Sequence, residues 1–117
     1  TALVIPELEG KMDGMAFRVP VENGSVTDIT AKLSRDVTID EVHEALQTAA
    51  DGRMKRVLRL TDEALVSRDI IGDPHSSIVD TDSTMLLQDD VVKVVSWYDN
   101  EWGYSARMVD MASVVAS

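Results

Sequence analysis

The chain contains no cysteine and few aromatic residues, and it carries no phosphate-binding loop. Without cysteine, disulfides, thiolate catalysis and cysteine-ligated metals are excluded for these 117 residues. No apolar run approaches the ~20 residues that cross a bilayer. Neither Gly-x-Gly-x-x-Gly nor Gly-Lys-Ser/Thr occurs, so the sequence gives no sign of a dinucleotide-binding fold.

Positive charge is also scarce. The chain has twenty-one acidic and eleven basic residues, which gives a formal net charge of −10. A chain of this charge is repelled by polyanions, which argues against nucleic acid or an anionic membrane as a partner. The hydrophobic share of 44% argues against disorder, and the length suits one domain.

The hydrophobic pattern predicts an α+β domain. Strands are expected over residues 15–21, 25–33, 56–60, 76–80, 84–88 and 91–97, and helices over residues 38–52 and 101–115. The first helix has the clearest start signal, because Thr38 and Glu41 form a capping box. This order predicts a mixed, largely antiparallel sheet, with helices on one face and a closing C-terminal helix.

The first predicted strand alternates apolar and other residues over positions 15–21. Its apolar side chains are expected to face the core, and Arg18 to project from the opposite face. Asn23 and Gly24 are typical of a tight turn, so this strand is expected to form a hairpin with residues 25–33.

A polar cluster, residues 99–101, lies between two aromatic pairs where the last predicted strand gives way to the last helix. Asn100 has two interpretations at this junction. It can cap the helix through its amide oxygen, or it can present a carboxamide to a ligand that is itself an amide. The residues alone leave both open.

Residues 96–105, Ser-Trp-Tyr-Asp-Asn-Glu-Trp-Gly-Tyr-Ser, resemble a segment near the C-terminus of phosphorylating glyceraldehyde-3-phosphate dehydrogenases. Residues 14–20, 67–69 and 72–77 resemble the same family in the same order. The resemblance covers essentially the whole chain. It implies that residues 1–117 are the C-terminal portion of a catalytic domain, with the dinucleotide-binding domain, the cysteine nucleophile and the histidine base preceding Thr1.

The resemblance also implies a function. The full-length enzyme would convert glyceraldehyde 3-phosphate, phosphate and NAD or NADP to 1,3-bisphosphoglycerate, as a cytoplasmic homo-tetramer of glycolysis or gluconeogenesis. Arg18 would hold the C3 phosphate of the substrate, Asn100 would bind the nicotinamide carboxamide, and Tyr104 would pack beside that ring. No catalytic or metal-binding residue is expected in this chain, which alone should be inactive.

Other interpretations remain beside this one. A surface ion pair is the ordinary role of an arginine such as Arg18. An erythrose-4-phosphate dehydrogenase, or a stand-alone binding or assembly module with the same fold, would also fit. His75 is expected in a turn rather than in a Ser/His pair, since the sequence supplies no orienting carboxylate for it. His43, with Asp40 and Glu44 at helical spacing, is expected on a solvated helix face rather than at a metal.

The closing helix, residues 101–115, is apolar around much of its circumference. Such a helix is expected to need burial on more than one side. The resemblance implies that it packs against the dinucleotide-binding domain, so in the isolated chain its surface should be bare and prone to self-association.

Overall fold

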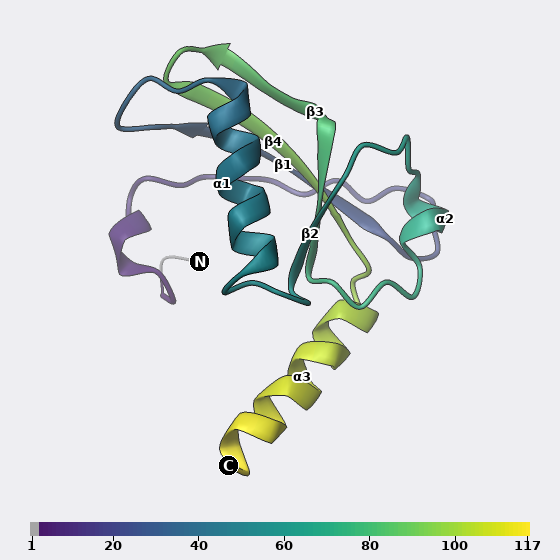
Figure 1. Ribbon diagram of the computed structural model, residues 1–117. Coiled ribbons are helices and arrows are strands. Elements are labelled where there is room, and N and C mark those ends of the chain that lie inside the picture. Colours follow the sequence, from purple (N-terminus) through teal and green to yellow (C-terminus); the bar gives the residue numbers. More distant parts are fainter. Residues whose placement is uncertain (1–2) are drawn as a thin grey trace.

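A computed structural model describes residues 3–117 as a four-stranded mixed sheet with the strand order β1-β4-β3-β2 (Figure 1). β1 pairs antiparallel with β4, β4 pairs antiparallel with β3, and β3 pairs parallel with β2. The predicted α+β class and mixed, largely antiparallel sheet are therefore confirmed. The elements are a 3-10 helix (Pro6–Leu8), β1 (Ser25–Lys32), α1 (Ile39–Asp51), β2 (Leu58–Thr61), α2 (Ser67–Ile70), β3 (Ser77–Gln88), β4 (Val91–Tyr98) and α3 (Trp102–Val115).

Local signals account for the start of α1. The Thr38 hydroxyl accepts a hydrogen bond from the Glu41 N–H at 3.2 Å, and the Glu41 carboxylate accepts one from the Thr38 N–H at 2.8 Å. The predicted capping box is thus confirmed. α1 lies against β2 and β3 on one face of the sheet (Figure 1).

The core is formed by buried apolar side chains from β2, α2, β3 and β4. Its buried apolar side chains are Leu58, Ile70, Ile78, Val79 and Val92. The two strands predicted over residues 76–80 and 84–88 are one strand, β3, with a register shift between Asp80 and Met85. At this irregularity the Asp80 carboxylate accepts hydrogen bonds from the N–H and the hydroxyl of Ser83, at 2.9 Å each.

The strand predicted over residues 15–21 is wrong. This segment has no strand hydrogen bonding, and it runs in an extended path past the sheet toward α2 (Figure 1). Its apolar side chains are exposed, Met15 by 81% and Phe17 by 79%. The predicted hairpin is wrong as well, because β1 pairs with β4 instead. The alternation signals a face that needs cover, and residues 3–117 provide none.

Two further features differ from the prediction, an additional short helix and the start of β2. The stretch between β2 and β3, where no helix or strand is predicted, contains α2, a single turn of helix. β2 begins at Leu58 rather than at residue 56, because Arg56 adopts a left-handed φ of 68° that no extended strand accommodates.

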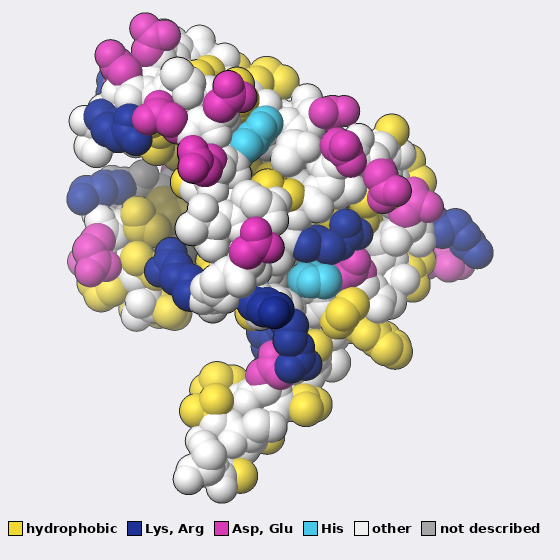
Figure 2. Space-filling model, viewed as in Figure 1, with side chains coloured by type: hydrophobic (Ala, Val, Ile, Leu, Met, Phe, Trp, Pro, Cys, Tyr) yellow, Lys and Arg dark blue, Asp and Glu magenta, His cyan; other side chains and the backbone are white. Residues whose placement is uncertain are grey.

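α3 projects away from the sheet (Figure 1), and its apolar side chains are bare along its length (Figure 2). The exposed large hydrophobic residues of this helix are Trp102, Tyr104, Met108, Val109, Met111, Val114 and Val115. The expectation of a bare apolar surface is confirmed, whereas self-association stays a prediction. Within residues 3–117, no helix is long and apolar enough to cross a membrane.

Candidate functional site

The junction between β4 and α3 is organised by a buried carboxylate, Asp99, which is only 2% exposed. Its Oδ2 accepts a hydrogen bond from the Gly72 N–H at 2.8 Å. Its Oδ1 accepts from the N–H groups of Glu101 at 2.9 Å and Trp102 at 2.8 Å. One side chain therefore joins the end of β4, the start of α3 and the loop that follows α2.

These contacts set the charge state of Asp99. Burial on its own would raise the pKa of this carboxyl. Hydrogen bonds from the backbone N–H groups of Gly72, Trp102 and Glu101, and from the side chain of Asn23, outweigh burial and hold the pKa well below its ordinary value. Asp99 is consequently a charged anchor, and it is tied to several elements at once.

Asn100 is not the N-cap of α3. The cap position is Glu101, whose side chain makes no cap hydrogen bond. The N–H groups of Glu101 and Trp102 donate to the Asp99 carboxylate instead. The Asn100 side chain belongs to an exposed residue, and its Oδ1 accepts a hydrogen bond from the Ser25 hydroxyl at 2.8 Å. The capping interpretation of Asn100 is thereby excluded, and its carboxamide remains available at the surface.

The segment Asn23-Gly24-Ser25 bridges this junction and α2, although Asn23 and Gly24 are predicted as a hairpin turn and Ser25 as the first residue of a strand. Gly24 has a φ of +86°, and a Cβ atom there would lie 2.5 Å from the backbone oxygen of Ser67. Only glycine permits that approach without displacement. We call this segment, together with Asp99 and Asn100, the junction cluster.

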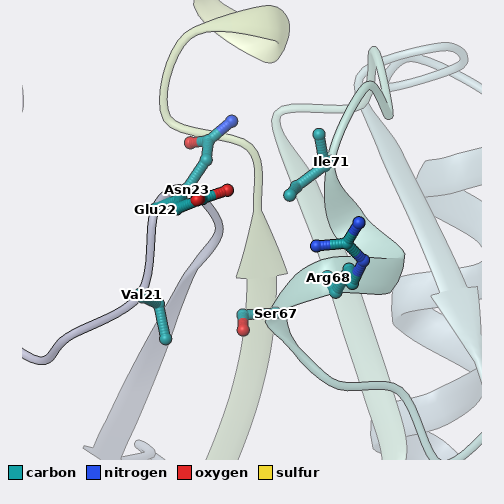
Figure 3. A pocket seen from close by; sticks show the side chains of 6 residues that line it. All are labelled: Val21, Glu22, Asn23, Ser67, Arg68 and Ile71. Carbon is teal, nitrogen blue, oxygen red and sulfur yellow. The ribbon is translucent and has the colours of Figure 1, made fainter.

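A small cavity of about 170 Å³ opens between this segment and α2. Figure 3 shows Glu22 and Asn23 on one side and the Arg68 and Ile71 side chains on the other. The lining residues are Val21, Glu22, Asn23, Ser67, Arg68 and Ile71. None of the three predicted site residues is among them.

Tyr104 lies in the first turn of α3 and is 68% exposed. The start of that helix sits tightly on a loop, because a Cβ at Gly103 would lie 2.9 Å from the backbone oxygen of His75. One turn later, Arg107 donates hydrogen bonds to the Pro74 carbonyl at 3.3 Å and to the Ser76 hydroxyl at 3.2 Å. The structure therefore holds Tyr104 in the element that follows Asn100, with its ring free.

Arg18 lies elsewhere, in the exposed extended segment of residues 15–21. Its guanidinium is a permanent charge with a planar fork of donors, which suits a phosphate. Asn100 thus lies just before α3 and Tyr104 in its first turn, whereas Arg18 belongs to a segment that the sheet does not hold.

The prediction that no carboxylate orients His75 is wrong. An orienting carboxylate is present, because the Asp73 Oδ1 lies 2.8 Å from the His75 Nδ1, and Asp73 also accepts from Arg59 at 3.0 Å. The neighbouring hydroxyls are engaged elsewhere: Ser76 bonds to Arg107, and Ser77 to Ser96. The cluster closes a turn, as expected, and contains no activated nucleophile.

The acidic residues near His43 do not assemble a metal site. Within the described residues, no group of three or more His, Cys, Asp or Glu side chains has an arrangement that could hold a metal ion. His43 lies partly covered on α1.

Sequence reasoning missed Ser25 and the anchoring role of Asp99. Asp99 had a signal, since an acidic residue stands just before the predicted helix. Ser25 had none, because its partner Asn100 is 75 positions away along the chain.

Comparison with known proteins gives a consistent result. The profile described as "Glyceraldehyde 3-phosphate dehydrogenase, C-terminal domain" matches residues 1–100. A "Glyceraldehyde-3-phosphate dehydrogenase" of Mycobacterium tuberculosis H37Rv is 54% identical over 113 residues, which cover 97% of this chain and 33% of that protein. The protein of that name from Geobacillus stearothermophilus is 54% identical over 116 residues, covering 99% of this chain and 35% of the relative. The chain thus spans about a third of the length of these curated relatives.

Proposed function

The chain belongs to the glyceraldehyde 3-phosphate dehydrogenase C-terminal domain family, and on that premise we propose that residues 1–117 are the C-terminal portion of the catalytic domain of such an oxidoreductase. The complete enzyme would convert glyceraldehyde 3-phosphate, phosphate and NAD or NADP to 1,3-bisphosphoglycerate. The observation that carries the proposal is the junction cluster, which leaves the Asn100 carboxamide exposed instead of using it as a helix cap.

Asn100 suits a nicotinamide cofactor by its chemistry. A carboxamide carries a donor and an acceptor, and so does the amide of nicotinamide, so the two groups can pair. When bound, NAD or NADP would supply the hydride acceptor, and Asn100 would hold the nicotinamide so that one face of its ring meets the substrate. The exposed ring of Tyr104, on the first turn of α3, would pack beside it.

Arg18 would bind the C3 phosphate of the substrate. Its exposed position leaves the guanidinium open to a ligand, and a bidentate arginine–phosphate contact gives orientation as well as affinity. Arg18 and Asn100 then both act by positioning, which lowers the entropic part of the barrier. The nucleophile and the base would be supplied by the preceding part of the full-length protein, which is also proposed to be a cytoplasmic homo-tetramer.

A kinetic experiment on the full-length protein tests the role of Arg18. Arg18→Ala should raise the KM for glyceraldehyde 3-phosphate about 10- to 100-fold, the value of one or two hydrogen bonds to a charged group. The KM for the cofactor should stay unchanged. Arg53→Ala, which removes another exposed arginine, is the matched control and should change neither constant. An unchanged substrate KM in Arg18→Ala would refute the assignment.

The same assay with erythrose 4-phosphate separates the two sugar phosphates as substrates. The proposal expects the higher kcat/KM with glyceraldehyde 3-phosphate. A higher kcat/KM with erythrose 4-phosphate would transfer the proposal to the other dehydrogenase while leaving the role of Arg18 as a phosphate-binding group intact.

A further inference from the structure

Ser25 is the first residue of β1, and its hydroxyl bonds to the Asn100 carboxamide. Ser25 stands opposite Tyr98 in the β1–β4 ladder, so the strand pairing itself brings the hydroxyl to the end of β4. The preceding residue restrains it from the other side, because Gly24 is packed against the backbone of Ser67.

The backbone on both sides of Asn100 is equally restrained. Asp99 is buried and accepts three backbone hydrogen bonds, one of them from the N–H of Glu101. Asn100 therefore has little backbone freedom, and the rotation of its own side chain is the main freedom left. The Ser25 hydroxyl acts on that rotation, because it holds the Oδ1 at 2.8 Å.

We propose that Ser25 is a positioning residue for nicotinamide binding, which holds Asn100 by its Oδ1 and thereby presents the NH₂ group of that carboxamide to the amide oxygen of the cofactor. This inference rests on the proposed function of Asn100 and deepens it. An amide has its donors on one end and its acceptor on the other. A bond that engages the oxygen end leaves the two N–H donors of Nδ2 to meet an acceptor on the ligand.

The expected gain is one of pre-organisation. Immobilising a free side chain on binding costs about 0.5–1.5 kcal/mol, and a side chain already held in place avoids that cost. The corresponding change in affinity is about 2- to 10-fold. Ser25 touches neither reacting atom nor substrate in this scheme, so its effect should fall on the cofactor alone.

The test uses the full-length protein with four variants: Ser25→Ala, Ser25→Thr, Asn100→Ala and the double variant Ser25→Ala/Asn100→Ala. Ser25→Ala should raise the KM for the cofactor about 2- to 10-fold and leave the KM for the sugar phosphate unchanged. Ser25→Thr keeps a hydroxyl and should restore the cofactor KM. Thr30→Ala, which removes an exposed hydroxyl from the same strand, is the matched control and should have no effect.

The double variant shows whether Ser25 acts through Asn100. Once Asn100 is alanine, Ser25→Ala should add nothing further to the cofactor KM, because residues that act through one contact are not additive. Deuteride transfer from cofactor labelled on one face of the nicotinamide ring supplies a second readout. The selectivity of this transfer for one face should fall in Ser25→Ala and should fall further in Asn100→Ala.

Several outcomes would overturn the inference. If Asn100→Ala raises the cofactor KM and Ser25→Ala does not, Ser25 has no positioning role while the proposed function stands. If the effects of the two substitutions on the cofactor KM simply add in the double variant, Ser25 likewise has no positioning role through Asn100. A Ser25→Ala variant with a lowered melting temperature and equal changes in both KM values would show a structural role only. If Asn100→Ala leaves the cofactor KM and the facial selectivity unchanged, the proposed role of Asn100 fails, and the inference fails with it.

Discussion

Residues 96–105 and residues 14–21 both contain a proposed ligand-binding side chain. The two segments differ in how far contacts within the chain hold them in place. The first stretch ends a central strand, and Asp99 ties it to the loop after α2 through Gly72 while it also accepts from Glu101 and Trp102 at the start of α3. The second is an extended segment whose apolar side chains are exposed. Asn100 is therefore placed by contacts inside the chain, whereas Arg18 is not.

The difference shows where each half of the proposed site gets its precision. Side chains must be held within a fraction of an ångström to position a ligand. The cofactor half meets this requirement with hydrogen bonds of its own. The phosphate half carries an apolar stripe (Met15, Phe17, Val19 and Val21) that finds no cover within residues 3–117, so Arg18 gains no comparable support from the residues that the structure describes.

The largest effect is expected from breaking the anchored half. Asp99→Ala would leave the N–H groups of Gly72, Glu101 and Trp102 without their acceptor, at a cost of about 3 kcal/mol in the free energy of unfolding. Denaturant unfolding measures it. Glu101→Ala, which removes an exposed carboxylate from the same loop, should change that energy by less than about 0.5 kcal/mol. Equal effects of the two substitutions would contradict the anchoring role.

The next effect comes from the close approach at Gly24. An added methyl group would lie 2.5 Å from the Ser67 oxygen, at a φ of +86°. Gly24→Ala should cost about 2 kcal/mol in unfolding free energy through strain and overlap. Gly10→Ala is the matched control, because Gly10 has a similar φ of +69° but open space around its Cβ position. The difference between the two variants measures the contact alone, and the absence of a difference would show that the approach is loose.

A smaller effect is expected from titration of Asp99. Its folded-state pKa is depressed, so the stability that it contributes is complete above the ordinary value of 3.8 and is lost as the pH falls below it. The free energy of unfolding should therefore decline by about 1–2 kcal/mol more in the natural chain than in Asp99→Asn between pH 5 and about pH 2. Parallel pH profiles for the two proteins would show that the carboxylate contributes no linked stability.

The smallest effect is expected in the unanchored half. Phe17 is 79% exposed, so Phe17→Ser should change the unfolding free energy of the 117-residue chain by less than about 0.5 kcal/mol. In the full-length protein the same substitution should cost about 3 kcal/mol, if upstream residues cover the apolar stripe. Similar small costs in both proteins would show that the stripe stays uncovered.

Sequence alone predicted the parts of the fold whose signals are local. The capping box at Thr38 and Glu41 involves residues three positions apart, and the α3 pattern spans one helix. The resemblance pointed to Asn100, which precedes α3, and to Tyr104, which lies exposed in the first turn of that helix. Whether they bind the cofactor remains a prediction.

The rest depended on contacts between distant residues. Alternation at residues 15–21 indicated a strand, but pairing needs a neighbouring strand, and β1 pairs with β4 instead. The hydrogen bond between Ser25 and Asn100 joins positions 75 apart, and nothing near either residue announces it. Asn23 and Gly24 are equally good as a hairpin turn and as a bridge to α2, since both uses need a left-handed glycine.

α3 is attached to the loop before β3 through its first turns, because Gly103 packs against the His75 carbonyl and Arg107 bonds to Pro74 and Ser76. The helix has 14 residues and is therefore ~21 Å long, so its C-terminal half extends beyond these contacts. Any tilt of the helix about this attachment would displace Val115 much farther than Tyr104, because displacement grows with distance from the point of attachment.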